Sequence, residues 1–452
     1  MGPTKRRWLT VVTGLVALLL AAPLRPAWTQ APVTLNVWAS PDNADALADI
    51  GQRFTQANPT IKITVTPISW EVLYPRMLAD IASRTGAFDV ATWDVMTAGA
   101  MAPGFVDLAK FREDNPRLVD PAYDLKDFHP TIWHIGGVWA GKNIGIPFYN
   151  NTMLFYYRKD HFANPTLQAK FKTQYGRDLK PPTTWQETVD VAKFFTKKFN
   201  PDSPTDYGIA LMFPRTHTLF YMYVLFFAPY RRSQDGLKKF GPVDLDYGDY
   251  FTAKKEPAFA TPEGVKAVED MKALLPYSPD PLGADYGETL ESFARGTVAM
   301  VPQWTGVWAA FREAAALKPI EQKVGVALMP GGHSVSGIWG LGINVASKHK
   351  PEAFRFLQFA TNKANDKAKF IKFGVAPARM STLKDPEARR LDPRVPVLEA
   401  TYPTQGYRPR IPQEPKLEDI TVGVLSEMLG GKRPITVAEL AKLADEWAKL
   451  LK

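Results

Sequence analysis

Alternating hydrophobic and polar residues predict strands at 33–38, 61–65 and 88–93. Between them, hydrophobic residues three or four positions apart predict helices over 43–57 and 73–86. This β-α-β-α-β order predicts an α/β fold with a parallel sheet and right-handed crossovers.

Polar residues follow each of these three strands. In open parallel sheets, ligands bind beyond the carboxyl ends of the strands. The residues at those ends are Ser40, Asp42 and Asn43, then Ser69, Trp70 and Glu71, then Asp94. We therefore expect these polar side chains to lie together at this edge of the sheet.

The rest of the chain predicts more helices and strands. A threonine with a glutamate two or three positions later predicts the start of a helix at Thr184, Thr261 and Thr436. Extended chain is predicted at 144–147 and 154–157, near Val298, and over the glycine-rich stretch 337–345. The stretch 231–257 is rich in charge, glycine and aromatic residues and is expected to be a surface excursion.

Composition fits a folded protein of two or three lobes. The chain has 452 residues, of which 45% are hydrophobic and 22% are charged, and this excludes a disordered protein. Cysteine is absent, which excludes disulfides, thiolate metal sites and cysteine nucleophiles. The 12 tryptophans suggest burial or use in binding.

The first 30 residues are typical of a secretory signal peptide. Lys5, Arg6 and Arg7 precede an apolar run over 8–22, which is too short to span a membrane. We expect export to a periplasm without a lipid anchor, because no cysteine is present. Residues 1–30 hold +4 of the net charge of +9, and the remaining +5 forms no basic stripe, so no nucleic-acid partner is expected.

Motifs for nucleotide, metal or catalytic chemistry are incomplete. The stretch 136–143 resembles a phosphate loop but lacks its final Ser or Thr. The stretch 332–336 lacks the last glycine of a nucleophile elbow. His129 and His134 do not have metal-ligand spacing. We therefore expect no cofactor, no metal and no catalytic residue.

An ordered set of segments carries a resemblance to a known family. These segments are Trp38, Asn58-Pro59, Phe88-Asp89-Val90 with Trp93-Asp94, Gly141 to Thr152, Tyr156 to Asp160, Pro181 to Trp185, Phe293 to Met300 with Trp304, and Trp339 to Asn344. Together they resemble the extracellular solute-binding proteins of ABC importers, in the sugar-binding family that includes maltose- and trehalose-binding proteins. The resemblance covers roughly 33–450.

The resemblance implies a two-lobed periplasmic-binding-protein fold of type II, with ligand in the cleft between the lobes. Residues 33–146 and 300–338 would form lobe 1, and residues 147–299 and 339–452 would form lobe 2. The crossings are expected near Gly145–Asn151, Gly296–Met300 and Gly340–Val345, where Gly or extended chain suits a hinge.

The resemblance also implies a set of ligand contacts. They are Asp42, Trp70, Asp94, Tyr149, Asn151, Trp304, Trp339 and Arg379. Many family members have Asp where Asn151 stands here, so the position keeps a hydrogen-bond acceptor and loses a charge. Asn43 is an alternative to Asp42. Each residue also has a structural explanation: the tryptophans as core, Asp94 as a helix cap, Tyr149 and Asn151 as hinge packing, and Arg379 as a loop charge.

The implied function is the periplasmic binding component of an ABC importer for a sugar or polyol, with the membrane permease subunits as partners and a monomer expected. Sugars offer an apolar C–H face to indole and hydroxyls to Asp, Asn and Arg. Two alternatives stay open. One is the same fold binding a phosphorylated polyol such as glycerol phosphate, and the other is a secreted carbohydrate-active enzyme.

Overall fold

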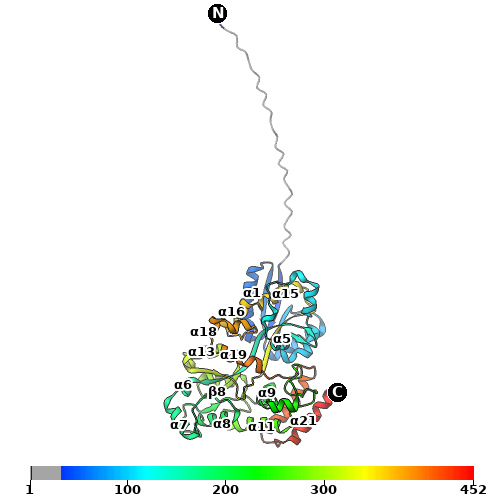
Figure 1. The fold of residues 1–452 in the computed structure, drawn as a ribbon. Coiled ribbons are helices and arrows are strands. Elements are labelled where there is room, and N and C mark those ends of the chain that lie inside the picture. Colours follow the sequence, from blue (N-terminus) through cyan, green and yellow to red (C-terminus); the bar gives the residue numbers. More distant parts are fainter. Residues whose placement is uncertain (1, 3–31) are drawn as a thin grey trace.

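The computed structural model describes Gly2 and residues 32–452. The predicted signal peptide, residues 1–30, otherwise lies outside the described residues. Figure 1 shows two lobes, one above the other. The upper lobe contains α1 (Pro41–Ala57), α5 (Pro130–Gly137), α15 (Lys350–Ala360) and α16 (Lys363–Phe373). The lower lobe contains α6 (Lys159–Phe162), α7 (Pro165–Tyr175), α8 (Trp185–Phe194), α9 (His217–Arg231), α11 (Pro262–Leu274) and α21 (Val437–Leu450).

The predicted β-α-β-α-β unit is present in the first lobe. It consists of β1 (Val33–Ala39), α1, β2 (Ile61–Pro67), α2 (Trp70–Ser83) and β3 (Val90–Asp94). β1 pairs with both β2 and β3 in parallel, so the predicted parallel arrangement is confirmed. Leu47, Ile50 and Phe54 of α1 are buried on one face, as their spacing predicts.

Two long antiparallel strands connect the lobes. β6 (Ile146–Arg158) pairs through its first half with β10 (Ser336–Ile343) and through its second half with β8 (Val298–Trp304) and β9 (Val324–Ala327). β10 also pairs with β3 of the first lobe, and its pairing with β6 shifts register between Trp339 and Gly340. β7 (Tyr207–Ile209) completes the sheet, whose order is β2-β1-β3-β10-β6-β8-β7.

Contacts between elements group some segments differently from the predicted lobes. α15 and α16, within the predicted second-lobe segment 339–452, pack against α1 of the first lobe. β8 and β9, within the predicted first-lobe segment 300–338, pair with the second half of β6. The predicted crossing Gly296–Met300 therefore lies inside the second lobe, whereas the other two predicted crossings lie in β6 and at the end of β10.

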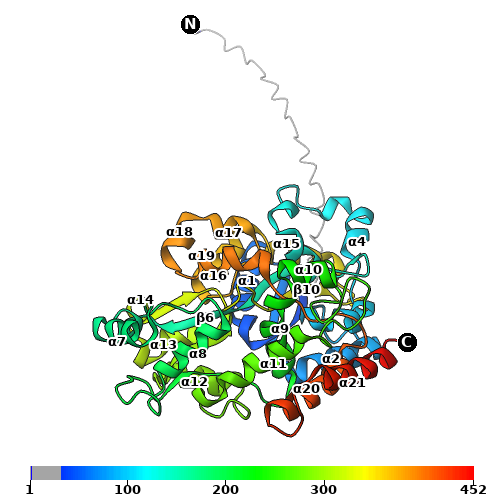
Figure 2. The same ribbon diagram turned by 60° about the horizontal axis from the view of Figure 1, so that its bottom comes forward.

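The C-terminal helices belong to the second lobe. α20 (Glu414–Leu429) packs against α9 and α11, and α21 packs against α11 and α20. Figure 2 shows α20 near α2 of the first lobe, and residues of these two helices line one pocket. Thr184, Thr261 and Thr436 each cap a helix as predicted, because each hydroxyl accepts a hydrogen bond from a backbone N–H of the first turn.

The stretch 231–257 is not a surface excursion. It contains α10 (Gln234–Phe240), and Asp249, Tyr250 and Phe251 are buried in the second lobe. Tyr250 stacks on Phe220 of α9 with 4.4 Å between ring centroids. The prediction was wrong because it gave weight to the glycines and charged residues of this stretch, whereas its buried aromatic residues attach it to the second lobe.

Shorter elements complete the described chain. They are α3 (Ala98–Met101), α4 (Leu108–Asp114), β4 (Val138–Trp139), β5 (Lys142–Asn143), α12 (Tyr286–Arg295), α13 (Trp308–Glu313), α14 (Ile320–Lys323), α17 (Met380–Lys384), α18 (Pro386–Leu391) and α19 (Val395–Thr401), with single turns of 3₁₀ helix between them. Within residues 32–452, no helix has the length and apolar character needed to cross a membrane.

Candidate ligand-binding site

A cavity of about 660 Å³ lies between the lobes, and we call it the main cavity. The first lobe contributes Ser40, Pro41, Asp42, Ser69, Trp70, Glu71 and Asp94, which follow β1, β2 and β3. The second lobe contributes Thr216, His217, Thr218, Tyr221, Asp285, Tyr286 and Gly287, from the starts of α9 and α12. Asn151, Trp304, Gly337, Trp339 and Arg408 complete it. The carboxyl ends of the strands thus meet the amino ends of two helices.

Three tryptophans form the aromatic part of this cavity. Trp304 and Trp339 are 7% and 5% exposed, and Trp70 is half-buried. Trp70 meets Trp339 edge to face, with ring centroids 5.8 Å apart. Trp304 meets Tyr221 in the same way at 5.1 Å. The indoles are therefore held in fixed orientations by aromatic neighbours.

Asp42 is one of the four acidic residues that line the main cavity. It is exposed to the solvent of the cavity, while the protein around it raises the pKa of its carboxyl by removing it from bulk water. Asn43, the alternative contact, is fully buried and does not line the cavity. The start of α1 therefore presents Asp42 to the cavity.

Asn151 is oriented by two hydroxyl groups behind it. Tyr149 Oη and Thr305 Oγ1 each donate to Asn151 Oδ1 at 2.8 Å. Because both hydroxyls use the amide oxygen, the amide nitrogen is left to donate into the cavity. Tyr149 itself is fully buried and does not line the cavity, and it contacts Asn151 from the side of the protein interior. Its pKa is raised well above the ordinary value, by burial first and then by the nearby Asp42.

Asp94 and Arg408 form a pair between distant parts of the chain. Asp94 Oδ1 accepts from the backbone N–H of Met96 at 3.1 Å and from Arg408 Nη2 at 3.4 Å. Asp94 thus caps a helical turn and also faces the cavity. Arg408 is 3% exposed, and its Nε has no hydrogen-bond partner within the described residues. Arg408 was not among the predicted contacts, because its partner lies 314 residues away in the sequence.

Asp285 joins the starts of α9 and α12. It accepts hydrogen bonds from Thr216 Oγ1 at 3.0 Å and from Thr218 Oγ1 at 2.6 Å, and it caps α12 in a capping box with Glu288. This residue was also missed. The box Asp285-x-x-Glu288 is visible in the sequence, but nothing local shows that it faces a cavity.

A match to a family model agrees with this architecture. The model, described as "Bacterial extracellular solute-binding protein", matches residues 40–367. The chain belongs to this family. The match begins at Ser40, the first residue of the main cavity, and continues through β10 and α15.

Two curated proteins are similar to this solute-binding protein over most of its length. A probable amino-acid ABC transporter periplasmic-binding protein of Sinorhizobium fredii (strain NBRC 101917 / NGR234) is 26% identical, over 88% of this chain and 84% of the relative. The mannitol-binding protein of Pseudomonas aeruginosa PAO1 is 25% identical, over 80% of this chain and 76% of the relative.

A solved structure shares the fold. It is an ABC transporter solute-binding protein from Agrobacterium radiobacter K84 in complex with ribitol, with a TM-score of 0.72 and 24% identity. The likeness covers 92% of this chain and 98% of the other. The predicted fold class, a two-lobed periplasmic-binding-protein fold of type II, is confirmed.

Arg379 lies outside the main cavity of this solute-binding protein. It is 1% exposed, donates to the carbonyls of Thr361 and Asp124, and stacks over the Phe128 ring at 4.2 Å. These partners belong to the first lobe, so Arg379 stabilises the framework there. Of the eight predicted contacts, six line the main cavity: Asp42, Trp70, Asp94, Asn151, Trp304 and Trp339.

The described residues contain no group of three His, Cys, Asp or Glu side chains arranged to hold a metal ion. The lining of the main cavity offers aromatic faces, carboxylate acceptors and amide or guanidinium donors. These are the groups that recognise a hydroxylated small molecule.

Proposed function

We propose that this solute-binding protein is the periplasmic component of an ABC importer and that it binds a sugar or polyol in the main cavity. The observation that carries the proposal is the joint presence of Trp70, Trp304 and Trp339 with acceptors and donors from both lobes. The mannitol-binding relative and the ribitol-bound structural neighbour support the same class of ligand.

The chemistry of the cavity suits a neutral hydroxylated ligand. A sugar C–H face packs on indole, while each hydroxyl both donates and accepts a hydrogen bond. Asp42 can accept, and the Asn151 amide nitrogen can donate. A cavity of about 660 Å³ lies within the range of small-molecule sites.

Charge argues against the phosphorylated polyol. Asp42, Glu71, Asp94 and Asp285 all line the main cavity, whereas Arg408, which is paired with Asp94, is the one arginine or lysine among the described residues that line it. A phosphate needs clustered cations or free backbone N–H groups, and the amino ends of α9 and α12 at this cavity are already capped by Thr216 and Asp285. Arg379, the cation predicted for this task, is held elsewhere by carbonyl oxygens.

The proposal includes export by the predicted signal peptide 1–30, a monomeric state and delivery to membrane permease subunits. It also includes closure of the lobes on the ligand, because contacts split between two lobes can be made together only when the lobes approach. β6 and β10 are the strands that would flex, and the register shift at Trp339 and Gly340 marks a break in their pairing.

Thermal-shift screening followed by calorimetry tests the proposal. The panel contains mannitol, ribitol, sorbitol, glucose, maltose, glycerol 3-phosphate and several amino acids. A ligand at a hundred times its Kd stabilises the native state by about 2.7 kcal/mol. We expect a sugar or polyol to give the largest shift, without turnover of the ligand. Preference for an amino acid or for glycerol phosphate would contradict the proposal, and hydrolysis of a glycoside would favour an enzyme.

A further inference from the structure

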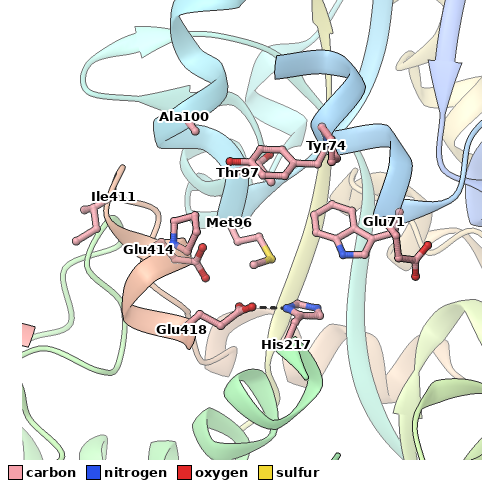
Figure 3. Close-up of a pocket in the computed structure, with 12 residues that line it drawn as sticks. Glu71, Tyr74, Met96, Thr97, Ala100, His217, Ile411, Glu414 and Glu418 are labelled. Atoms are coloured by element: carbon pink, nitrogen blue, oxygen red, sulfur yellow. Dashed lines mark hydrogen bonds and ion pairs between the residues drawn. The ribbon is translucent and has the colours of Figure 1, made fainter. Parts of the chain in front are cut away.

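A smaller cavity of about 240 Å³ opens beside the main cavity, and we call it the acidic side pocket. It shares Trp70, Glu71 and His217 with the main cavity, so one ligand can reach both. Its other lining residues are Tyr74, Pro75, Met96, Thr97, Ala100, Ile411, Glu414, Pro415 and Glu418. Figure 3 shows Tyr74 and Glu71 on one side and Glu414 and Glu418 of α20 on the other.

Three carboxyl groups line the acidic side pocket, those of Glu71, Glu414 and Glu418, and no lysine or arginine of residues 32–452 lines it. His217 is the one basic side chain in this part of the chain that lines it, and its Nδ1 lies 3.3 Å from Glu418 Oε2. Figure 3 draws this contact. His217 therefore contacts Glu418, whereas the cation that acts on Glu414 is Arg408, which lies outside the lining of the acidic side pocket and is paired with Asp94.

Glu414 is the unusual member of this group. It is 2% exposed, and its Oε1 is buried without a hydrogen-bond partner among the described residues. Figure 3 shows its carboxylate directed into the pocket, toward Glu418 and Met96. A buried carboxyl is costly to ionise, and a cation bound at the cavity wall would offset that cost.

Two aromatic rings stand near these acids. Trp70 and Tyr74 stack with an interplanar angle of 14° and ring centroids 6.3 Å apart. Aromatic faces attract cations, most strongly in desolvated sites. Metal binding is a poorer fit, since the described carboxylates and His217 do not converge on one point.

We propose that the acidic side pocket binds a protonated amine, so that the ligand is a hydroxylated molecule carrying an amino group, such as an amino sugar or amino polyol. This inference rests on the proposed function, because the hydroxylated part of the ligand occupies the main cavity. The ammonium donates hydrogen bonds to Glu414 and Glu418 beside the aromatic rings.

Proton release accompanies this binding. Burial, followed by repulsion from Glu418, raises the pKa of Glu414 well above its ordinary range. Other charged or titratable groups face it: Glu71 and Tyr74 from α2, Asp94 from β3, His217 from α9, Arg408, and Tyr250 from the segment after α10. A bound ammonium favours the ionised carboxylate, so Glu414 gives up its proton.

Calorimetry with matched pairs of probes tests the proposal on the mature chain. The pairs are D-sorbitol with D-glucamine and D-glucose with D-glucosamine, each at pH 6.5. We expect the amine of at least one pair to bind tenfold or more tightly than its neutral partner. Its heat of binding should depend on buffer ionisation enthalpy, as release of a proton requires.

Variants locate the effect. In Glu414→Gln and Glu418→Gln we expect the preference for the amine to fall below threefold, while affinity for the neutral partner stays within threefold. Asp419→Asn is the matched control: it removes one negative charge from an exposed position of α20 outside the pocket, and it should keep the preference.

Three outcomes would overturn the proposal. Equal affinity within each pair would leave the acids as a structural pair that shares a proton, with the proposed function intact. A preference that survives in Glu414→Gln would place the amine elsewhere in the cavity. Absence of binding by all four probes, together with a negative wider panel, would remove the proposed function and this inference together.

Discussion

The ring of Trp304 occupies space that exists because residue 337 has no side chain. A Cβ atom at Gly337 would lie 2.7 Å from Cζ3 of the Trp304 ring, closer than atoms of that kind can approach. Gly337 belongs to β10, and Trp304 is the last residue of β8. The missing side chain at Gly337 therefore allows the Trp304 ring to lie against β10. Both residues line the main cavity.

Gly337→Ala should therefore displace the Trp304 ring and weaken ligand binding. We expect Kd to rise about tenfold, or about 1.4 kcal/mol, and folding stability to fall by about 1–3 kcal/mol through overpacking. Calorimetry and thermal melting measure the two effects. Gly423→Ala is the control, because Gly423 lies in α20 with only Arg215 Nη2 near its added Cβ, at 3.6 Å. An unchanged Kd in Gly337→Ala would show that the ring position does not matter for binding.

The tryptophans should separate into two kinds on truncation. Trp339 is nearly buried and packs in the core, so Trp339→Ala should cost about 3–5 kcal/mol of folding stability as well as affinity. Trp70 is half-buried, so Trp70→Ala should lose about 2–4 kcal/mol of binding with a smaller loss of stability. Melting of the ligand-free variants and Kd measurements decide this. Normal affinity in Trp70→Ala would remove Trp70 from the site.

The elements β1 to β3 could be predicted from the local sequence pattern, whereas the residues of the site could be predicted only in part. β1 to β3 are readable because alternation and helical spacing are local, and the polar residues after each strand lie at the cavity for that reason. Arg408 and Asp285 were missed, since their roles depend on partners or cavities that tertiary structure brings together. Arg379 shows the reverse case: its sequence surroundings do not reveal that carbonyls and the Phe128 ring enclose it.

Asn151 should act as a donor toward the ligand. Asn151→Asp keeps an oxygen for the Tyr149 and Thr305 hydroxyls but replaces the cavity-facing N–H groups with a second acceptor oxygen. We expect near-normal stability and about tenfold weaker binding of a neutral polyol. Asn151→Leu removes the acceptor that both hydroxyls share and leaves them only their 3.4 Å contact with each other, so it should lower stability by about 1–3 kcal/mol. Equal or tighter polyol binding by Asn151→Asp would mean that the amide nitrogen makes no ligand contact.

Closure of the lobes should be visible in solution. The main cavity takes residues from both lobes, so a ligand that contacts both stabilises the state in which they are closer. Small-angle X-ray scattering should show a smaller radius of gyration with saturating ligand than with a non-binding sugar at the same concentration. Identical profiles would indicate a rigid cavity and would remove β6 and β10 as hinges.

Glu414 should make folding stability fall as pH rises. Its pKa is raised in the folded state by burial and by Glu418. At pH 4 the carboxyl is mostly protonated in both states, so Glu414→Gln and the unmodified chain should have similar stability. As pH rises past about 4.5, the unfolded chain loses this proton while the folded chain keeps it, which favours unfolding until the folded pKa is passed. At pH 8 we therefore expect Glu414→Gln to be more stable than the unmodified chain. Denaturant unfolding of ligand-free protein from pH 4 to pH 8 measures the difference, with Asp419→Asn as the variant that should follow the unmodified chain. A constant difference between Glu414→Gln and the unmodified chain across this range would show that Glu414 keeps an ordinary pKa in the folded protein.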